Sequence, residues 1–181
     1  MSKSKTLGAI ISGLENIWGA SINDPGGAVD IALAAKRHRR QVFFIGNGGS
    51  AAIASHMAAD WLKNGNVRAM CFNEAALITA LTNDLGYGYV FSNPLLLLAN
   101  RGDLLFAISS SGASQSILAA VEKAKVMGLN VITLSGFSAD NPLRKMGDVN
   151  FYIPSDRYGV IEVCHHAICH AILDEVIGAG T

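Results

Sequence analysis

The sequence has 181 residues, with 14 basic and 14 acidic side chains, and half of its residues are apolar. This length fits one domain with a full core, and a charged fraction of 15% excludes a disordered or fibrous chain. The neutral balance gives no electrostatic case for nucleic acid as the main partner, although residues 36–40 (KRHRR) form a basic run. Such a run is typical of a solvated helix end or, alternatively, of a phosphate-steering patch.

Two helices are predicted at the N-terminus. Apolar residues recur at helical spacing over residues 6–40, and the segment NDPGG at residues 23–27 divides them. A narrow helical hairpin cannot bury both of its faces alone. We therefore expect it to pack against the body of the domain or against another subunit.

From residue 42 onward, short apolar segments alternate with helical ones. The expected strands cover residues 42–46, 67–72, 103–109, 130–136 and 149–154. The expected helices cover residues 50–63, a segment from about 74, a segment ending at 127, a short segment after 136, and residues 160–177. This order predicts an α/β fold, a three-layer αβα sandwich with a five-stranded parallel sheet. We expect one domain over residues 1–181, with the hairpin in 1–40 and the αβα core in 41–181.

The cysteines and the hydropathy pattern indicate the compartment. Cys71, Cys164 and Cys169 show no CxxC spacing, which fits neither a disulfide framework nor a zinc knuckle. The first ten residues contain no long apolar segment, and no apolar run approaches the roughly 18 residues that span a bilayer. We expect a cytoplasmic protein with no membrane partner.

Two strand-to-helix turns have the composition of an anion site. The first, GNGGS at residues 46–50, lets the backbone approach a ligand closely, and Ser50 can cap the following helix. The second, SSSGAS at residues 109–114, contains four serine hydroxyls, which suit a phosphomonoester better than a simple helix cap requires. A serine-rich loop without a ligand remains the alternative. The sequence contains neither GxxxxGK[ST] nor GxGxxG, which argues against a nucleoside triphosphate and a dinucleotide.

Histidines and carboxylates recur at helical spacing on two segments. His56 and Asp60 are four residues apart, and Glu162, His166 and His170 follow one another at intervals of four. The first pair alone is more typical of a helix surface. Three ionisable groups on one face of an otherwise apolar helix are costly to bury without a role, and this ligand type suits zinc or another divalent ion.

Four motifs together resemble the SIS (sugar isomerase) family, most closely the phosphoheptose isomerases. They are GNGGS, TNDLGYGY at residues 82–89, SSSGAS, and a terminal helix that ends in His170. The resemblance covers about residues 6–177. It implies conversion of sedoheptulose 7-phosphate to glycero-manno-heptose 7-phosphate, a zinc cofactor, and a homotetramer with active sites between subunits.

The resemblance also assigns roles to residues. Substrate contacts are implied for Asn47, Gly48, Gly49, Ser50, Asn83, Asp84, Ser109, Ser110, Ser111 and Ser114. Zinc ligands are implied at His56, Asp60, Glu162 and His170. The family has Glu and Gln where this chain has Asp60 and Glu162, and an acidic residue where it has Gly159. These departures suggest a distinct subgroup, with another phosphosugar as one option.

The expected chemistry is a proton transfer between C1 and C2 through an enediol. Asp60 or Glu162 is the expected acid/base on one side and His170 on the other, while His165 is expected to be structural and His166 either supports the site or has no part in it. Glu162 and His170 are about 12 Å apart along a regular helix, so both reach one ion only if the helix start is irregular or Glu162 belongs to another chain. The rival interpretations are a non-catalytic SIS protein of the replication-initiator-associating type and a sugar-phosphate sensor.

Overall fold

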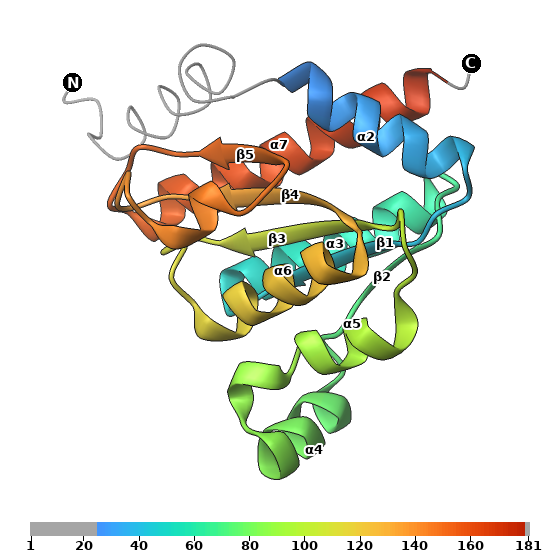
Figure 1. Ribbon diagram of the computed structural model, residues 1–181. Helices are drawn as coiled ribbons and strands as arrows, with labels where there is room; N and C mark the ends of the chain where they lie inside the picture. The colour runs from blue at the N-terminus through green and yellow to red at the C-terminus, as the bar shows by residue number, and fades with distance from the viewer. Residues whose placement is uncertain (1–24, 180–181) are drawn as a thin grey trace, which may run out of the picture.

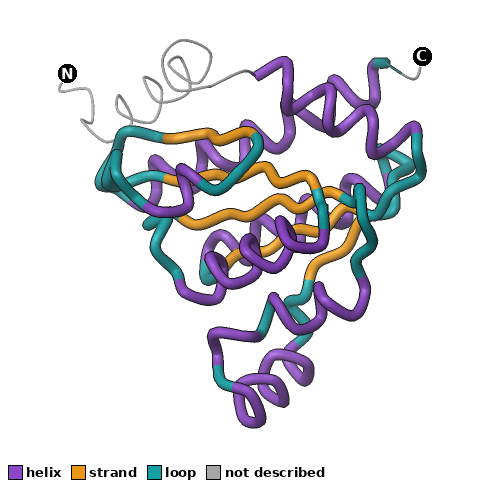
Figure 2. Tube along the Cα trace, viewed as in Figure 1, coloured by secondary structure: helices purple, strands orange, loops and turns teal. Residues whose placement is uncertain are grey.

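The computed structural model describes residues 25–179, so the first helix of the expected hairpin lies outside the described residues. The strands are β1 (Val42–Gly46), β2 (Ala69–Cys71), β3 (Leu104–Ser109), β4 (Asn130–Ser135) and β5 (Val149–Tyr152). The α-helices are α2 (Pro25–Arg37), α3 (Gly49–Lys63), α4 (Ala75–Leu85), α5 (Ser92–Leu98), α6 (Gln115–Met127) and α7 (Tyr158–Gly178). Two 3-10 helices, η1 (Tyr87–Tyr89) and η2 (Pro142–Lys145), complete the fold (Figures 1 and 2).

The five strands form one parallel sheet in the order β2-β1-β3-β4-β5. Val42 pairs with Leu104 and Gly46 with Ile108, so β1 and β3 run side by side to the same edge. The order of the strands reverses between β1 and β3. In open parallel sheets, this switch point at the carboxyl ends of the strands is where ligands bind.

Helices cover both faces of the sheet, which confirms the expected sandwich. Alternate strand residues point to opposite faces, so Phe44 faces α2, α3 and α7 while Phe43 and Ile45 face α5 and α6. Figure 1 shows α6 on the near side of the sheet, α3 and α7 behind it, and α2 lying along α7. The two terminal helices of the described chain are also joined by a hydrogen bond of 2.8 Å from Nζ of Lys36 to the carbonyl oxygen of Val176.

Three aromatic rings hold α3 against the sheet. Phe44 stacks on Phe106 with ring centroids 4.7 Å apart, and Trp61 of α3 packs edge-on against both rings at 5.7 and 5.4 Å. All three side chains are fully buried. The packing therefore fixes the position of α3, and of every side chain on it, relative to β1 and β3.

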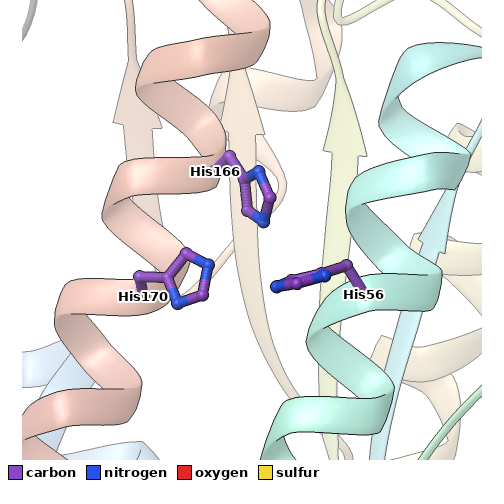
Figure 3. Close-up of side chains that lie close together, drawn as sticks. All are labelled: His56, His166 and His170. Carbon is purple, nitrogen blue, oxygen red and sulfur yellow. The ribbon is translucent and has the colours of Figure 1, made fainter.

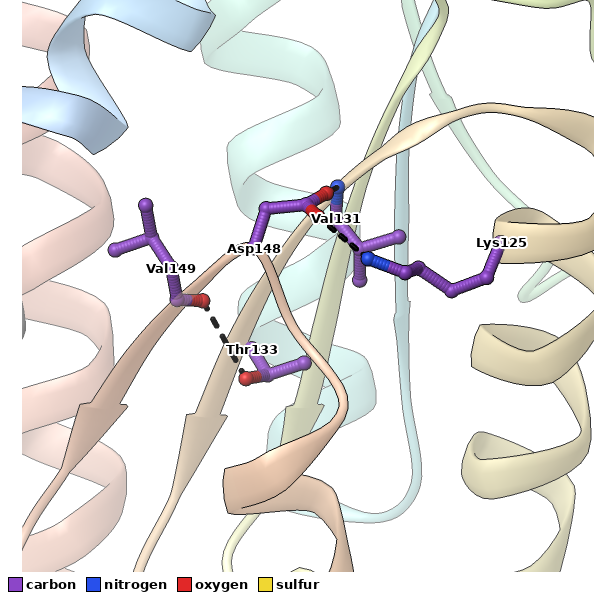
Figure 4. A network of polar contacts seen from close by, with 5 residues as sticks. All are labelled: Lys125, Val131, Thr133, Asp148 and Val149. Atoms are coloured by element: carbon purple, nitrogen blue, oxygen red, sulfur yellow. Dashed lines mark hydrogen bonds and ion pairs between the residues drawn. The ribbon is translucent and has the colours of Figure 1, made fainter.

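A polar network attaches the edge strand β5. One carboxylate oxygen of Asp148 accepts a hydrogen bond of 2.8 Å from the backbone N–H of Val131, and the other accepts one from Lys125 (Figure 4). The Thr133 hydroxyl lies 3.5 Å from the carbonyl oxygen of Val149. These contacts join α6, β4 and the start of β5.

The predicted elements agree with the structure except at three places. The second strand is shorter than residues 67–72, because the N–H of Val67 donates to the carbonyl of Trp61 and so stays attached to the end of α3. The short helix expected after residue 136 is the 3-10 helix η2. Helix α5 was not predicted, because its run of leucines is only partly buried and shows no periodicity. Within residues 25–179, no helix is both long and apolar enough to cross a membrane.

The aromatic packing gives a prediction for stability. We expect Phe106→Ala to lower the free energy of unfolding by about 3–5 kcal/mol, because it removes a fully buried ring that packs against both Phe44 and Trp61. Urea unfolding followed by circular dichroism measures the change. Val126→Ala is the control, since that side chain is 84% exposed, and its effect should stay within about 0.5 kcal/mol. An equal effect of both substitutions would contradict this account of the core.

Candidate active site

The two turns expected to bind anions lie at adjacent strand ends. GNGGS follows β1, and the serine turn, residues 109–114, follows β3. Nδ2 of Asn47 donates a hydrogen bond of 3.1 Å to the Ser116 hydroxyl at the start of α6. The Tyr87 hydroxyl of η1 donates to Oδ1 of Asn47 at 2.7 Å. The side-chain amide of Asn47 thus links the first turn to η1 and to the start of α6, directly after the serine turn.

The serine turn presents hydroxyl groups around a helix N-terminus. Ser109 Oγ accepts from the N–H of Gly112 at 3.2 Å and lies 3.3 Å from Ser114 Oγ, while Ser111 Oγ accepts from the N–H of Ala113 at 3.3 Å. Ser110 Oγ is buried and has no hydrogen-bond partner among the described residues. A buried hydroxyl without a partner is costly, so this group is suited to a ligand oxygen. Ser114 is the N-cap of α6 but its hydroxyl makes no cap hydrogen bond.

A glycine is required inside the serine turn. Gly112 has a φ of +62°, and a side chain there would collide with the amide of Asn141. Asn141 is itself held by a hydrogen bond of 3.2 Å from its Nδ2 to the carbonyl of Gly136. The loop before η2 therefore supports the serine turn from behind.

The predicted sugar contacts Asn83 and Asp84 lie near the end of α4, and both are exposed. Nδ2 of Asn83 donates to Oδ1 of Asp84 at 2.8 Å. Tyr87, three residues later, reaches Asn47, so the end of α4 connects to the first turn through η1.

Helices α3 and α7 lie side by side, and the first turn of α3 lies next to the second turn of α7. The carboxylate of Glu162 lies so close to Gly49 that a Cβ at residue 49 would be 2.5 Å from its oxygens. This contact places Glu162 at the first turn of α3, beside GNGGS. A larger residue at position 49 would push the two helix starts apart, so the glycine has a steric role here.

Three imidazoles converge further along the same two helices. His56 projects from α3, and His166 and His170 project from α7 toward it (Figure 3). One nitrogen from each ring lies within 4.8 Å of one nitrogen from each of the others. The ring centroids are 4.7–5.3 Å apart. Donors of this type and spacing could hold a divalent ion.

The carboxylate of Asp60 borders the imidazole cluster. Its Oδ2 lies 3.2 Å from Nε2 of His56 and 4.0 Å from Nδ1 of His170. Burial, followed by the neighbouring His170 and His56, lowers the pKa of His166, and Asp60 opposes this effect. His166 is therefore biased toward the neutral form, which is the form that binds metals.

His165 points into the protein interior instead. It is fully buried, and its Nε2 lies 3.1 Å from the carbonyl oxygen of Ser135 at the end of β4. Burial lowers its pKa to about 4, and the hydrogen bond with Ser135 opposes this only in part. The side chain is part of the contact between α7 and the sheet.

The structure brings the predicted residues into two groups. Asn47, Glu162 and the serine turn lie around the strand ends, whereas His56, Asp60 and His170 lie together along α3 and α7. Within one chain Glu162 is not among the clustered histidines, in line with its spacing from His170. Sequence reasoning missed Ser116, Tyr87 and Asn141. Only the YGY following the predicted sugar contacts could have pointed to Tyr87.

Comparisons with known proteins find relatives that cover most of this chain. A family model described as SIS domain matches residues 10–136. The phosphoheptose isomerase of Campylobacter concisus is 37% identical over 146 residues, covering 75% of this chain and 77% of that protein. The phosphoheptose isomerase of Coxiella burnetii is 32% identical over 145 residues, covering 76% and 73%. The structure of phosphoheptose isomerase GmhA from Neisseria gonorrhoeae matches with a TM-score of 0.88 and 28% identity, covering 96% of this chain and 95% of that one.

The buried His165 gives a pH prediction. Its pKa is about 4 in the folded protein and near 6.5 when unfolded, so the unfolded state binds more protons between these values. The contribution of the neutral His165 to the free energy of unfolding should therefore be fully present above pH 6.5. It should decline by on the order of 3 kcal/mol as the pH falls toward 4. Urea unfolding at several pH values, with chelator present, should show a flatter acid decline in His165→Gln. Parallel curves for the two proteins would refute the assignment.

Proposed function

Because the chain belongs to the SIS domain family, and within it to the phosphoheptose isomerases, we propose that it interconverts sedoheptulose 7-phosphate and glycero-manno-heptose 7-phosphate. The observation that carries this proposal is the hydrogen bond from Asn47 to Ser116, which links GNGGS at the switch point to the start of α6, directly after the serine turn. The two turns form a phosphate site next to a carboxylate and a histidine cluster, which is the set of groups that an aldose-ketose isomerisation needs.

The serine turn holds the phosphate in this proposal. Ser110 offers a hydroxyl that has no partner among the described residues, and Ser109, Ser111 and Ser114 lie around it at the start of α6. Hydroxyl and N–H donors at a helix N-terminus suit a dianionic phosphate without the need for a cationic side chain. The sugar then extends toward GNGGS and its neighbour Glu162, with Asn83 and Asp84 as contacts from α4.

Glu162 is the base that lies nearest to the sugar. Its carboxylate contacts Gly49 in the turn where substrate is expected, whereas Asp60 is about three turns further along α3 and is paired with His56. A carboxylate at this place removes a proton from the carbon beside the carbonyl and returns it to the neighbouring carbon. His170 is the partner acid/base for the oxygen atoms, and Asp60 orients the imidazoles.

The imidazole cluster supports a divalent metal, with zinc as the first choice. The buried Nε2 of His166 has no hydrogen-bond partner in the described chain, and the His56 and His170 rings face it. These donors fit a metal that is bound through nitrogen. When bound, a divalent ion supplies a Lewis acid for the oxygens on the reacting carbons.

Turnover in D2O tests the reaction. Proton NMR of the protein with sedoheptulose 7-phosphate and zinc should show the aldose product and solvent exchange at the carbon next to the carbonyl. Glu162→Gln should lower kcat by about 100-fold or more, because it removes the base without changing the shape of the site. Glu175→Gln, exposed near the other end of α7, is the control and should retain full activity.

Three other outcomes of the same experiment are informative. Loss in Asp60→Asn with activity kept in Glu162→Gln would identify Asp60 as the base. Turnover of sedoheptulose without its phosphate would contradict the role of the serine turn. No exchange with this or related ketose phosphates, in protein that holds metal, would refute the isomerase and leave a binding or sensing role.

The same proposal includes a cytoplasmic homotetramer with active sites between subunits. Support comes from α4, which carries Asn83 and Asp84 but buries none of its own residues in the described chain. Leu97 on α5 is 75% exposed, with Leu96 and Leu98 exposed beside it. Such an apolar surface is typical of a contact with another subunit.

Light scattering on the purified protein measures the assembly. Four chains of 19.0 kDa give an expected mass of about 76 kDa. Leu97→Glu should lower this mass, because it places a charge in the proposed contact, whereas Lys145→Glu on η2 should not. A monomeric wild-type protein with full isomerase activity would contradict sites shared between subunits.

A further inference from the structure

We propose that His166 is a third imidazole ligand of the metal, so that this chain holds the ion with His56, His166 and His170 and leaves Glu162 free. The family resemblance implied a set of His56, Asp60, Glu162 and His170 and gave His166 no role. The inference rests on the proposed function only in placing the metal at the same site. Its test is metal binding, so it can fail while the isomerase stands.

The first support is the position of the three rings. His166 and His170 are four residues apart on α7, and His56 faces both from α3 (Figure 3). Two nitrogens on a tetrahedral zinc ion are roughly 3.3 Å apart, given zinc-nitrogen bonds of about 2.0–2.1 Å. The donor atoms here lie within 4.8 Å of one another. Small side-chain rotations are enough to bring them onto one ion.

The second support is the unsatisfied nitrogen of His166. Its Nε2 is buried and has no hydrogen-bond partner in the described part of the chain. An unpaired buried polar atom is costly, and metal coordination removes that cost.

The third support is the distance of Glu162 from the cluster. Gly49 fixes the Glu162 carboxylate at the start of α3, and His56 follows seven residues later, about 10 Å along that helix. His166 and His170 are the α7 residues at the level of His56, as the ring contacts show. Within one chain, His166 therefore occupies the place in the cluster that the resemblance gave to position 162.

Cobalt binding separates the two ligand sets. Apo protein, prepared with chelator, is titrated with Co2+ while the visible d–d absorption is recorded, and then with Zn2+ in competition. We expect His166→Ala to lower the affinity for Co2+ and for Zn2+ by about 100-fold or more. It should also reduce the intense d–d absorption that is typical of a tetrahedral cobalt site. Glu162→Ala, which removes the side chain that the resemblance made a ligand, should stay within about 3-fold of wild type. His38→Ala, an exposed histidine on another helix end, is the matched control.

The opposite pattern overturns the inference. If His166→Ala binds like wild type while Glu162→Ala loses affinity, the ligand set is the one that the resemblance implied. If the folded wild-type protein binds neither ion, no metal site exists here, whatever its activity.

A second measurement covers the case in which His166→Ala does not fold. Imidazole 15N shifts of the wild-type protein, which has five histidines, should change on zinc addition for His56, His166 and His170 and stay constant for His38 and His165. An unchanged His166 signal would equally refute the proposal.

Discussion

The in-register parallel pairing of β1 with β3 is the constraint on which the rest of the structure depends. It ends both strands at one edge, so that GNGGS and the serine turn emerge together and the Asn47 amide can reach Ser116. The same pairing stacks Phe44 on Phe106. Because side chains alternate along a strand, a shift of one residue would turn one of these rings to the wrong face and would also separate the two turns. Core packing and site geometry are therefore set by one register.

The contact between α3 and α7 determines which side chains of these two helices come together in the candidate site. Trp61 fixes α3 on the sheet, and the absence of a side chain at Gly49 lets Glu162 lie against the first turn. The relative level of the two helices then determines which side chains meet further along. His165, one residue before the cluster, faces the sheet as a buried neutral ring, whereas His166 faces α3. A 100° step along one helix separates a structural histidine from a proposed ligand.

Local patterns in the sequence predicted most of the fold. The alternation of apolar segments and helices predicted all five strands, and the turn compositions singled out the two turns that are proposed to bind the substrate. Contacts between distant segments could not be deduced in this way: Tyr87 reaches Asn47 across 40 residues, and Asn141 fits beneath Gly112. The spacing of Glu162, His166 and His170 on one face of α7 was visible in the sequence. Which residues of α3 they contact depends on how the two helices are positioned against each other. The position of α7 along α3 depends on contacts between distant segments, such as that of Glu162 with Gly49, and no single segment of the sequence determines it.

The departures from the family pattern form one coherent change when they are placed on α3 and α7. At position 60 the carboxylate is shorter, and the structure keeps it at His56, within the cluster, where it can orient imidazoles. At position 162 a neutral amide is replaced by a carboxylate that lies beside the sugar turn. Because the side chain at position 162 lies at the turn rather than among the imidazoles, the ion lacks the donor that the resemblance placed there, and His166 faces that position. The site gains one carboxylate in this view, and the groups that hold the metal differ from those that transfer the proton.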